Sequence, residues 1–141
     1  MGETLSHPVR DVASAGPVTV DESTSLRLAA RSLWMSSIGA LVVLREGKPV
    51  GILSERDIVE HVGRGADPAT TTAGDAMTSP IVLARPYDRV LDATIAMLDH
   101  GIRHLPVIDD AGGLVGMVSI RDLLRPMLVD ALELPHADAV S

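Results

Sequence analysis

The stretch Gly51-Ile52-Leu53-Ser54-Glu55-Arg56-Asp57-Ile58-Val59 recurs later in the chain as Gly116-Met117-Val118-Ser119-Ile120-Arg121-Asp122-Leu123-Leu124. The two stretches share Gly, Ser, Arg and Asp at the same spacing, and their apolar positions stay apolar. The offset between them, from position 51 to position 116, is 65 residues. Self-similarity at a fixed offset indicates a duplicated structural unit. We therefore expect two copies of one unit in this chain.

The repeat continues upstream of these stretches. Residues 38–44 match residues 102–108, and Val9-Arg10-Asp11-Val12 matches Ala73-Gly74-Asp75-Ala76, both at an offset of 64. The offset therefore changes by one residue in the polar, Gly-containing segments that follow residues 44 and 108. Hairpin turns tolerate such an insertion at little cost, so the pattern predicts a hairpin at this place in each repeat.

Each repeat reads as strand, helix, strand, strand, helix. The expected strands are 17–20 and 80–83, the first helices are about 23–36 and 87–100, and the hairpins pair 40–44 with 50–54 and 104–108 with 114–119. The apolar residues of 87–100 surround more of that helix than one stripe would, which predicts packing on two sides. Ser54 and Ser119 are expected to be N-caps of the closing helices, with Asp57 and Asp122 in their first turns. Pro126 is expected to kink or restart the last helix.

These elements define a mixed α/β (α+β) fold with two repeats, each a small three-stranded sheet with two helices. A unit of about 55 residues buries too little apolar surface to be stable alone, so we expect the two sheets to pack together. The predicted division is 8–65 for the first repeat, 66–73 for a linker, 74–134 for the second repeat and 135–141 for a flexible acidic tail.

Composition excludes several functional classes. Twelve Lys and Arg against nineteen Asp and Glu give a net charge of −7, which disfavours nucleic acid because its phosphates are repelled. Cys is absent, so disulfides and thiolate metal sites are excluded. No leader peptide or run of 18 apolar residues is present, and the expected location is cytoplasmic, without membrane insertion. The histidines lack metal-ligand spacing, and no Walker motif or nucleophile elbow occurs, so we expect neither a metal nor catalysis.

The doubled Gly-x-x-Ser-x-x-Asp, following Ile102-Arg103-His104-Leu105-Pro106-Val107-Ile108, resembles the cystathionine β-synthase (CBS) domain family over nearly the whole chain. The resemblance implies a tandem pair packed as a pseudo-two-fold disc with two clefts between the repeats. In that family the clefts take AMP, ADP, ATP or S-adenosylmethionine as a regulatory ligand rather than as a cofactor. It therefore implies a stand-alone regulatory module that changes conformation and signals to an unidentified protein partner.

The resemblance also implies roles for individual residues. Ser54 and Ser119 would contact phosphate, and Asp57 and Asp122 would accept hydrogen bonds from the ribose hydroxyls. Arg103 and His104 would lie at the phosphate. The adenine would be lined by Val18, Thr19, Ile81 and Val82. The first repeat departs from the pattern, because Gly39 and Ala40 stand where the second repeat has Arg103 and His104.

Other readings of the same residues remain open. Asp57 and Asp122 would also offset the helix dipole as ordinary first-turn residues, and the chain could be an interaction module that dimerises or docks without a ligand. A homodimer is expected in either case, through apolar residues on the helices of the second repeat: Leu91, Ile95, Leu98, Leu123, Leu124, Met127 and Leu128.

Overall fold

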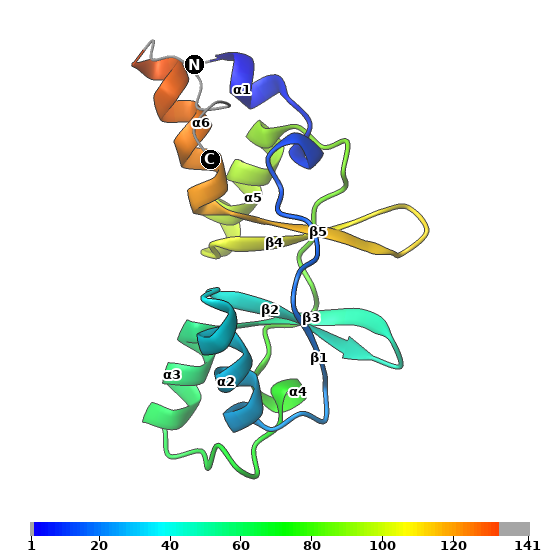
Figure 1. Cartoon of the computed structure of the whole chain (residues 1–141), viewed down its shortest axis with the longest axis vertical. Coiled ribbons are helices and arrows are strands. Elements are labelled where there is room, and N and C mark those ends of the chain that lie inside the picture. The colour runs from blue at the N-terminus through cyan, green and yellow to red at the C-terminus, as the bar shows by residue number, and fades with distance from the viewer. Residues whose placement is uncertain (1, 133–141) are drawn as a thin grey trace. The chain divides into compact units, whose positions relative to one another are not determined.

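The computed structural model describes residues 2–132, and the predicted acidic tail lies outside them. It contains α1 (Gly2–Ser6), the 3-10 helix η1 (Val9–Asp11), β1 (Thr19–Asp21), α2 (Leu26–Ser36), β2 (Ala40–Arg45), β3 (Lys48–Ser54), α3 (Glu55–Gly63), α4 (Ala73–Ala76), α5 (Val90–His100), β4 (His104–Ile108), β5 (Leu114–Ser119) and α6 (Ile120–Ala131) (Figure 1). The predicted α+β fold of small sheets and helices is confirmed. Among the described residues, no helix is long and apolar enough to cross a bilayer.

The chain folds into two compact units that do not coincide with the sequence repeats. Among the described residues, one unit comprises 2–16, Leu83–Ala111 and 115–132, and the other comprises Pro17–Val82 with Gly112–Leu114. The first segment of each repeat therefore belongs to the unit that holds the sheet of the other repeat. We call these the leading segments: the first ends at Gly16 and the second ends at Val82. We call the unit built around β4 and β5 the Asp122 unit, and the unit built around β1, β2 and β3 the Asp57 unit.

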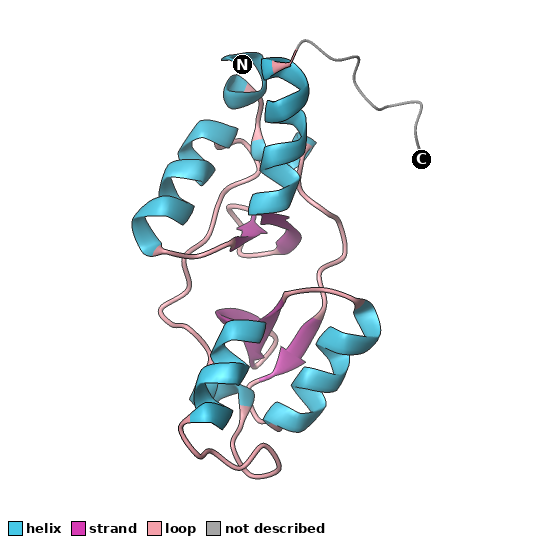
Figure 2. Cartoon of the chain, turned by 90° about the vertical axis from the view of Figure 1, so that its left-hand side faces the viewer, coloured by secondary structure: helices cyan, strands magenta, loops and turns pink. Residues whose placement is uncertain are grey.

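The Asp57 unit is a three-stranded sheet in the order β1-β2-β3, with β1 parallel and β3 antiparallel to β2. Figures 1 and 2 show α2 and α3 together on one face of this sheet. Leu26, Ala29 and Leu33 form one apolar face of α2, and this face is buried in the core with residues of the sheet and of α4. The turn at Glu46 and Gly47 has positive φ at both positions, which matches the twist of a two-residue hairpin.

The Asp122 unit has only a two-stranded sheet, β4-β5, with α5 and α6 on one face (Figure 2). The strand predicted at 80–83 is wrong. Only Ala84 bridges in parallel to Val107, with its amide donating to the Pro106 carbonyl and its carbonyl accepting from the Ile108 amide, both at 2.9 Å.

Two prolines explain the missing strand. In the Asp57 unit the Val42 amide donates to the Val18 carbonyl, and the Glu22 amide donates to the Leu44 carbonyl. At an offset of 64 these donors become Pro106 and Pro86, which have no amide hydrogen. The ladder therefore cannot extend on either side of Ala84.

The helices of the Asp122 unit differ from the sequence expectation in two respects. Helix α5 buries Val90, Ala93 and Met97 but leaves Ile95 and Leu98 exposed, so the described residues do not cover that part of its apolar surface. Helix α6 runs through Pro126 as one helix instead of restarting there. Near its end, the Thr4 amide of α1 donates to Asp130 at 3.1 Å, and the Thr4 hydroxyl also contacts this carboxylate.

Candidate functional site

The Gly-x-x-Ser-x-x-Asp motif ends a strand and begins a helix in both units. Ser54 accepts a hydrogen bond from the Asp57 amide at 3.2 Å, and the Asp57 carboxylate accepts one from the Ser54 amide at 2.9 Å. Ser119 and Asp122 form the same pair of bonds at 3.1 and 2.9 Å. These reciprocal bonds are capping boxes. The predicted N-caps are confirmed, and each Asp has a structural role whether or not it binds a ligand.

The motif glycines permit a close crossing by the leading segment of the other repeat. A Cβ on Gly51 would lie 2.9 Å from the Thr78 carbonyl oxygen, and one on Gly116 would lie 2.9 Å from the Ser14 carbonyl oxygen. In the same places Thr78 bridges antiparallel to Ile52, and Ser14 bridges antiparallel to Met117. The crossing therefore adds a third residue beside the Ser and Asp of each motif, and this residue, Thr78 or Ser14, carries a hydroxyl that the sequence reasoning did not identify.

In the Asp57 unit, this third residue contacts the motif carboxylate. The Thr78 hydroxyl donates to Asp57 at 3.3 Å from Oδ1 and 3.4 Å from Oδ2. Val18 and Thr19 belong to the same unit, Thr19 as the first residue of β1 and Val18 just before it, and Ile81 and Val82 also fall within this unit. Asp57 and Ser54 are half-buried, so the helix N-terminus is accessible to solvent.

In the Asp122 unit, Arg103 and His104 lie at the entrance to β4. The Ile120 amide, the first of α6, donates to the Arg103 carbonyl at 2.9 Å, so the Arg103 backbone is held beside the N-terminus of α6. The Arg103 side chain is exposed and His104 is half-buried. In the Asp57 unit the Glu55 amide donates to Gly39 at 3.0 Å, which gives the same backbone arrangement without a cationic side chain.

A third capping box, outside the motif, provides a comparison for the motif carboxylates. Thr72 and Asp75 begin α4 with reciprocal bonds of 3.1 Å, outside the Gly-x-x-Ser-x-x-Asp motif. The Thr72 backbone and side-chain hydrogen bonds hold the pKa of Asp75 below its ordinary value of 3.8. Among the described residues, no group of three or more potential metal ligands is found.

Comparisons with known proteins agree with this arrangement of motifs. The family model of the CBS domain matches residues 9–64 and 73–128. An uncharacterised protein of Methanopyrus kandleri is 35% identical over 128 residues, which cover 88% of this chain and 63% of that protein. The chain therefore spans less than two thirds of that relative's length.

Solved structures are also similar. A signal-transduction protein with CBS domains from Burkholderia ambifaria superposes with a TM-score of 0.81 and 27% identity, covering 87% of this chain and 95% of that one. A CBS domain pair solved in complex with 5′-methylthioadenosine and S-adenosyl-L-methionine superposes with a TM-score of 0.79 and 28% identity, covering 87% and 97%.

Proposed function

The chain belongs to the CBS domain family, and we propose that it is a regulatory module that binds an adenosine nucleotide, AMP, ADP, ATP or S-adenosylmethionine, and signals to a protein partner. A structural relative at 28% identity was solved with two adenosine compounds. The adenosine group that those two ligands share carries a vicinal ribose diol. The proposal therefore concerns a site that recognises adenosine, with phosphate or another group attached at the 5′ position.

The observation that carries the proposal is the hydrogen bonding of the two carboxylate oxygens of Asp122. Its Oδ2 accepts the Ser119 amide hydrogen at 2.9 Å, which fixes the orientation of the carboxylate. Within residues 2–132, no hydrogen bond to its Oδ1 is found. A carboxylate that faces a vicinal diol accepts two charge-assisted hydrogen bonds, which are stronger than neutral ones. Asp122 is half-buried, and its carboxylate is already held by the capping bond. Ligand binding would therefore cost little side-chain conformational entropy at this residue.

The N-termini of α3 and α6 suit a phosphate or another anionic group. Helix N-termini carry unpaired amides and a positive dipole end, and both favour anions. Arg103 would add a cation at the α6 end only. The proposal includes no catalytic step, since binding alone is sufficient for a regulatory module.

A second candidate function, docking or dimerisation without a ligand, is favoured by exposed apolar residues. Leu98 on α5 is 72% exposed, and Leu128 on α6 is 56% exposed. Four such residues, Ile95, Leu98, Leu124 and Leu128, form the set that we call the α5–α6 patch. The sequence also assigned Leu123 to this surface, but Leu123 is fully buried. We propose that the α5–α6 patch forms the contact of a homodimer, because exposed apolar surface usually marks an interface.

Thermal melting in the presence of adenosine compounds tests the first function. A ligand at 100 times its dissociation constant stabilises the folded state by about 2.7 kcal/mol. We expect AMP, ATP or S-adenosylmethionine to raise the melting temperature of the wild type, and Asp122→Asn to reduce that shift, because asparagine can keep the cap but loses the charge. Asp75→Asn is the matched control, since it alters a capping carboxylate outside the motif. If no adenosine compound at millimolar concentration shifts melting, the ligand-free function is preferred.

A further inference from the structure

The two motif carboxylates have the same capping bonds but different surroundings. In both units the leading segment crosses the strand before the motif helix with two backbone hydrogen bonds. Thr78 and Ile52 exchange theirs at 2.8 and 3.2 Å, and Ser14 and Met117 exchange theirs at 2.8 and 2.9 Å. The backbone therefore carries Ser14 to the place in the Asp122 unit that Thr78 has in the Asp57 unit.

Only one of the two hydroxyls reaches its carboxylate. The Thr78 hydroxyl lies 3.3 and 3.4 Å from the two oxygens of Asp57, so its hydrogen is shared between them. No hydrogen bond from Ser14 to Asp122 is found within the described part of the chain. Since the backbone bridges are alike, the difference resides in the side chains: a threonine in one unit and a serine in the other.

We infer that Thr78 is a specificity-determining residue that occupies the carboxylate of Asp57 and makes the N-terminus of α3 the weaker of two diol-binding sites. The inference rests on the proposed function. A hydroxyl placed nearly equally from both carboxylate oxygens fills the position that a ribose hydroxyl would take. A diol must therefore displace the Thr78 hydrogen bond at Asp57, whereas at Asp122 it has no such bond to displace.

The size of the effect follows from the strength of one hydrogen bond. A well-formed hydrogen bond to a charged group contributes about 1.5–3 kcal/mol, which corresponds to roughly a ten- to 150-fold change in a dissociation constant. The 3.3 and 3.4 Å separations exceed the usual O–H···O distance of about 2.5–3.0 Å, so this bond is much weaker than a well-formed one. Removal of the Thr78 hydroxyl should therefore tighten diol binding at Asp57 by about threefold, and by no more than tenfold.

Calorimetry in a single-site background tests the inference. In the Asp122→Asn background, titration with adenosine reports the Asp57 site, and Thr78→Val removes the hydroxyl while keeping the volume of the side chain. We expect Thr78→Val to tighten adenosine binding about threefold there and to leave binding of 2′,3′-dideoxyadenosine unchanged, because that compound has no diol. A change confined to the diol-bearing ligand is not expected from a residue that only supports the fold. Thr78→Ala gives a second measurement should Thr78→Val fail to fold.

The matched control is Ser14→Ala in the Asp57→Asn background, where adenosine affinity should not change. Unchanged or weaker adenosine binding in Thr78→Val, or equal gains for adenosine and the dideoxy compound, would overturn the role of Thr78 while leaving the proposed function standing. Absence of adenosine binding to the wild type would instead reject the proposed function, and the role of Thr78 with it.

Discussion

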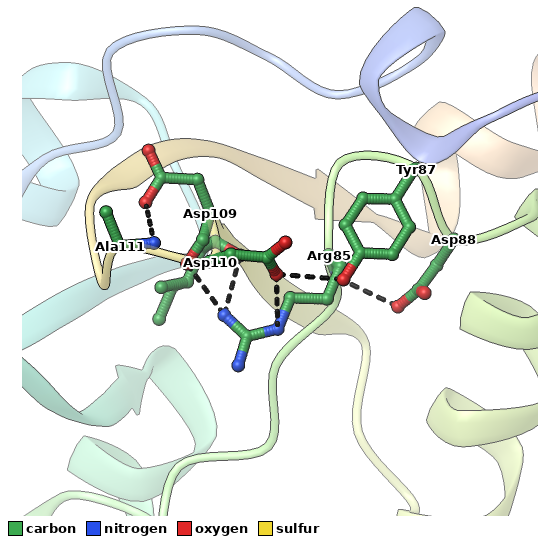
Figure 3. Close-up of polar contacts among 7 residues, drawn as sticks. Arg85, Tyr87, Asp88, Asp109, Asp110 and Ala111 are labelled. Atoms are coloured by element: carbon green, nitrogen blue, oxygen red, sulfur yellow. Dashed lines mark hydrogen bonds and ion pairs between the residues drawn. The ribbon is translucent and has the colours of Figure 1, made fainter.

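The Arg85 guanidinium donates from Nη1 to the Ile108 carbonyl oxygen at 3.1 Å, which is the oxygen that the Pro86 amide would bond if proline had one. In the Asp57 unit the equivalent oxygen, on Leu44, accepts from the Glu22 amide at 2.8 Å. Figure 3 shows the Arg85 side chain extended along the end of β4 toward Asp109 and Asp110. The Arg85 side chain thus donates to the carbonyl oxygen whose equivalent in the other repeat accepts from a backbone amide.

We predict that Arg85→Ala destabilises the Asp122 unit by about 1–2 kcal/mol, because it leaves the buried Ile108 carbonyl without this donor. It also removes the 2.7 Å bond from Arg85 to the Asp109 carbonyl. The decisive variant is Arg85→Ala combined with Pro86→Ala, which restores an amide at the position of the missing donor. Urea unfolding should show partial recovery in the double variant. A double variant no more stable than Arg85→Ala would show that Arg85 stabilises the unit in another way.

Tyr87 provides a spectroscopic report on the same hairpin. Its hydroxyl donates to Asp110 at 2.8 Å (Figure 3). This hydrogen bond is the main cause that raises the pKa of Tyr87 above 10.0, with desolvation and the charge of Asp110 adding to it. The folded pKa lies above the unfolded one, so the stabilisation is present below about pH 10 and is lost as pH rises through the folded value.

Tyr87 is the single tyrosine, so ultraviolet titration of the phenol reads this group alone. We predict a midpoint above pH 10 in the wild type and a lower one in Asp110→Asn, where the negative charge is removed. Asp99→Asn is a suitable control because Asp99 is an exposed acidic residue on α5 that has no part in the Tyr87 contact. Equal midpoints for wild type and Asp110→Asn would contradict the role of this hydrogen bond.

The capping boxes predict that stability and ligand binding can be separated. Removal of a Ser or Thr N-cap costs about 0.5–2 kcal/mol, so Ser119→Ala and Thr72→Ala should both lower the free energy of unfolding. Only Ser119→Ala should also weaken a phosphate-bearing ligand, because Thr72 lies outside the motif. Parallel melting and calorimetry on the two variants measure both quantities. Equal effects of the two variants on affinity would mean that the cap acts on binding through folding alone.

The α5–α6 patch predicts the oligomeric state. We expect light scattering at micromolar concentration to give about twice the 14.8 kDa of one chain and Leu98→Glu to give a monomer, because a buried carboxylate without a partner is costly. Leu28→Glu is the matched control: Leu28 is 54% exposed on α2, in the other unit. Dissociation by Leu28→Glu, with Leu98→Glu still dimeric, would place the interface elsewhere.

The sequence predicted the repeat, the hairpins and the two N-caps because each depends on local spacing and on the chemistry of a few adjacent residues. It did not predict the shortened sheet, since the loss of strand 80–83 depends on Pro106 in a distant strand. It also missed Thr78. That residue reaches Asp57 only because the leading segment of one repeat packs on the other, and no periodicity within either repeat encodes this exchange. A comparison of Ser14 and Thr78 at the offset of 64 was the signal available.

Arg103 and Gly39 are equivalent positions of the two repeats, and only Arg103 has a charged side chain. This difference predicts that Arg103 strengthens the binding of ligands that carry a phosphate. Both backbones accept a hydrogen bond from the first amide of a motif helix, but only Arg103 adds a cation there. A hydrogen bond to a charged group contributes about 1.5–3 kcal/mol, and about 1.4 kcal/mol is a factor of ten in affinity.

We therefore expect Arg103→Ala to weaken binding of AMP or ATP by about tenfold or more and to leave adenosine, which has no phosphate, nearly unchanged. The net charge of −7 increases the value of a local cation, because the rest of the surface repels anions. Arg125→Ala is the matched control, since Arg125 is an exposed arginine on α6 beyond its first turn. Calorimetry with AMP and adenosine on the three proteins measures the difference directly. Equal losses of AMP and adenosine affinity in Arg103→Ala would mean that Arg103 supports the fold, and the phosphate of AMP would then have to be bound by the helix amides and Ser119 alone.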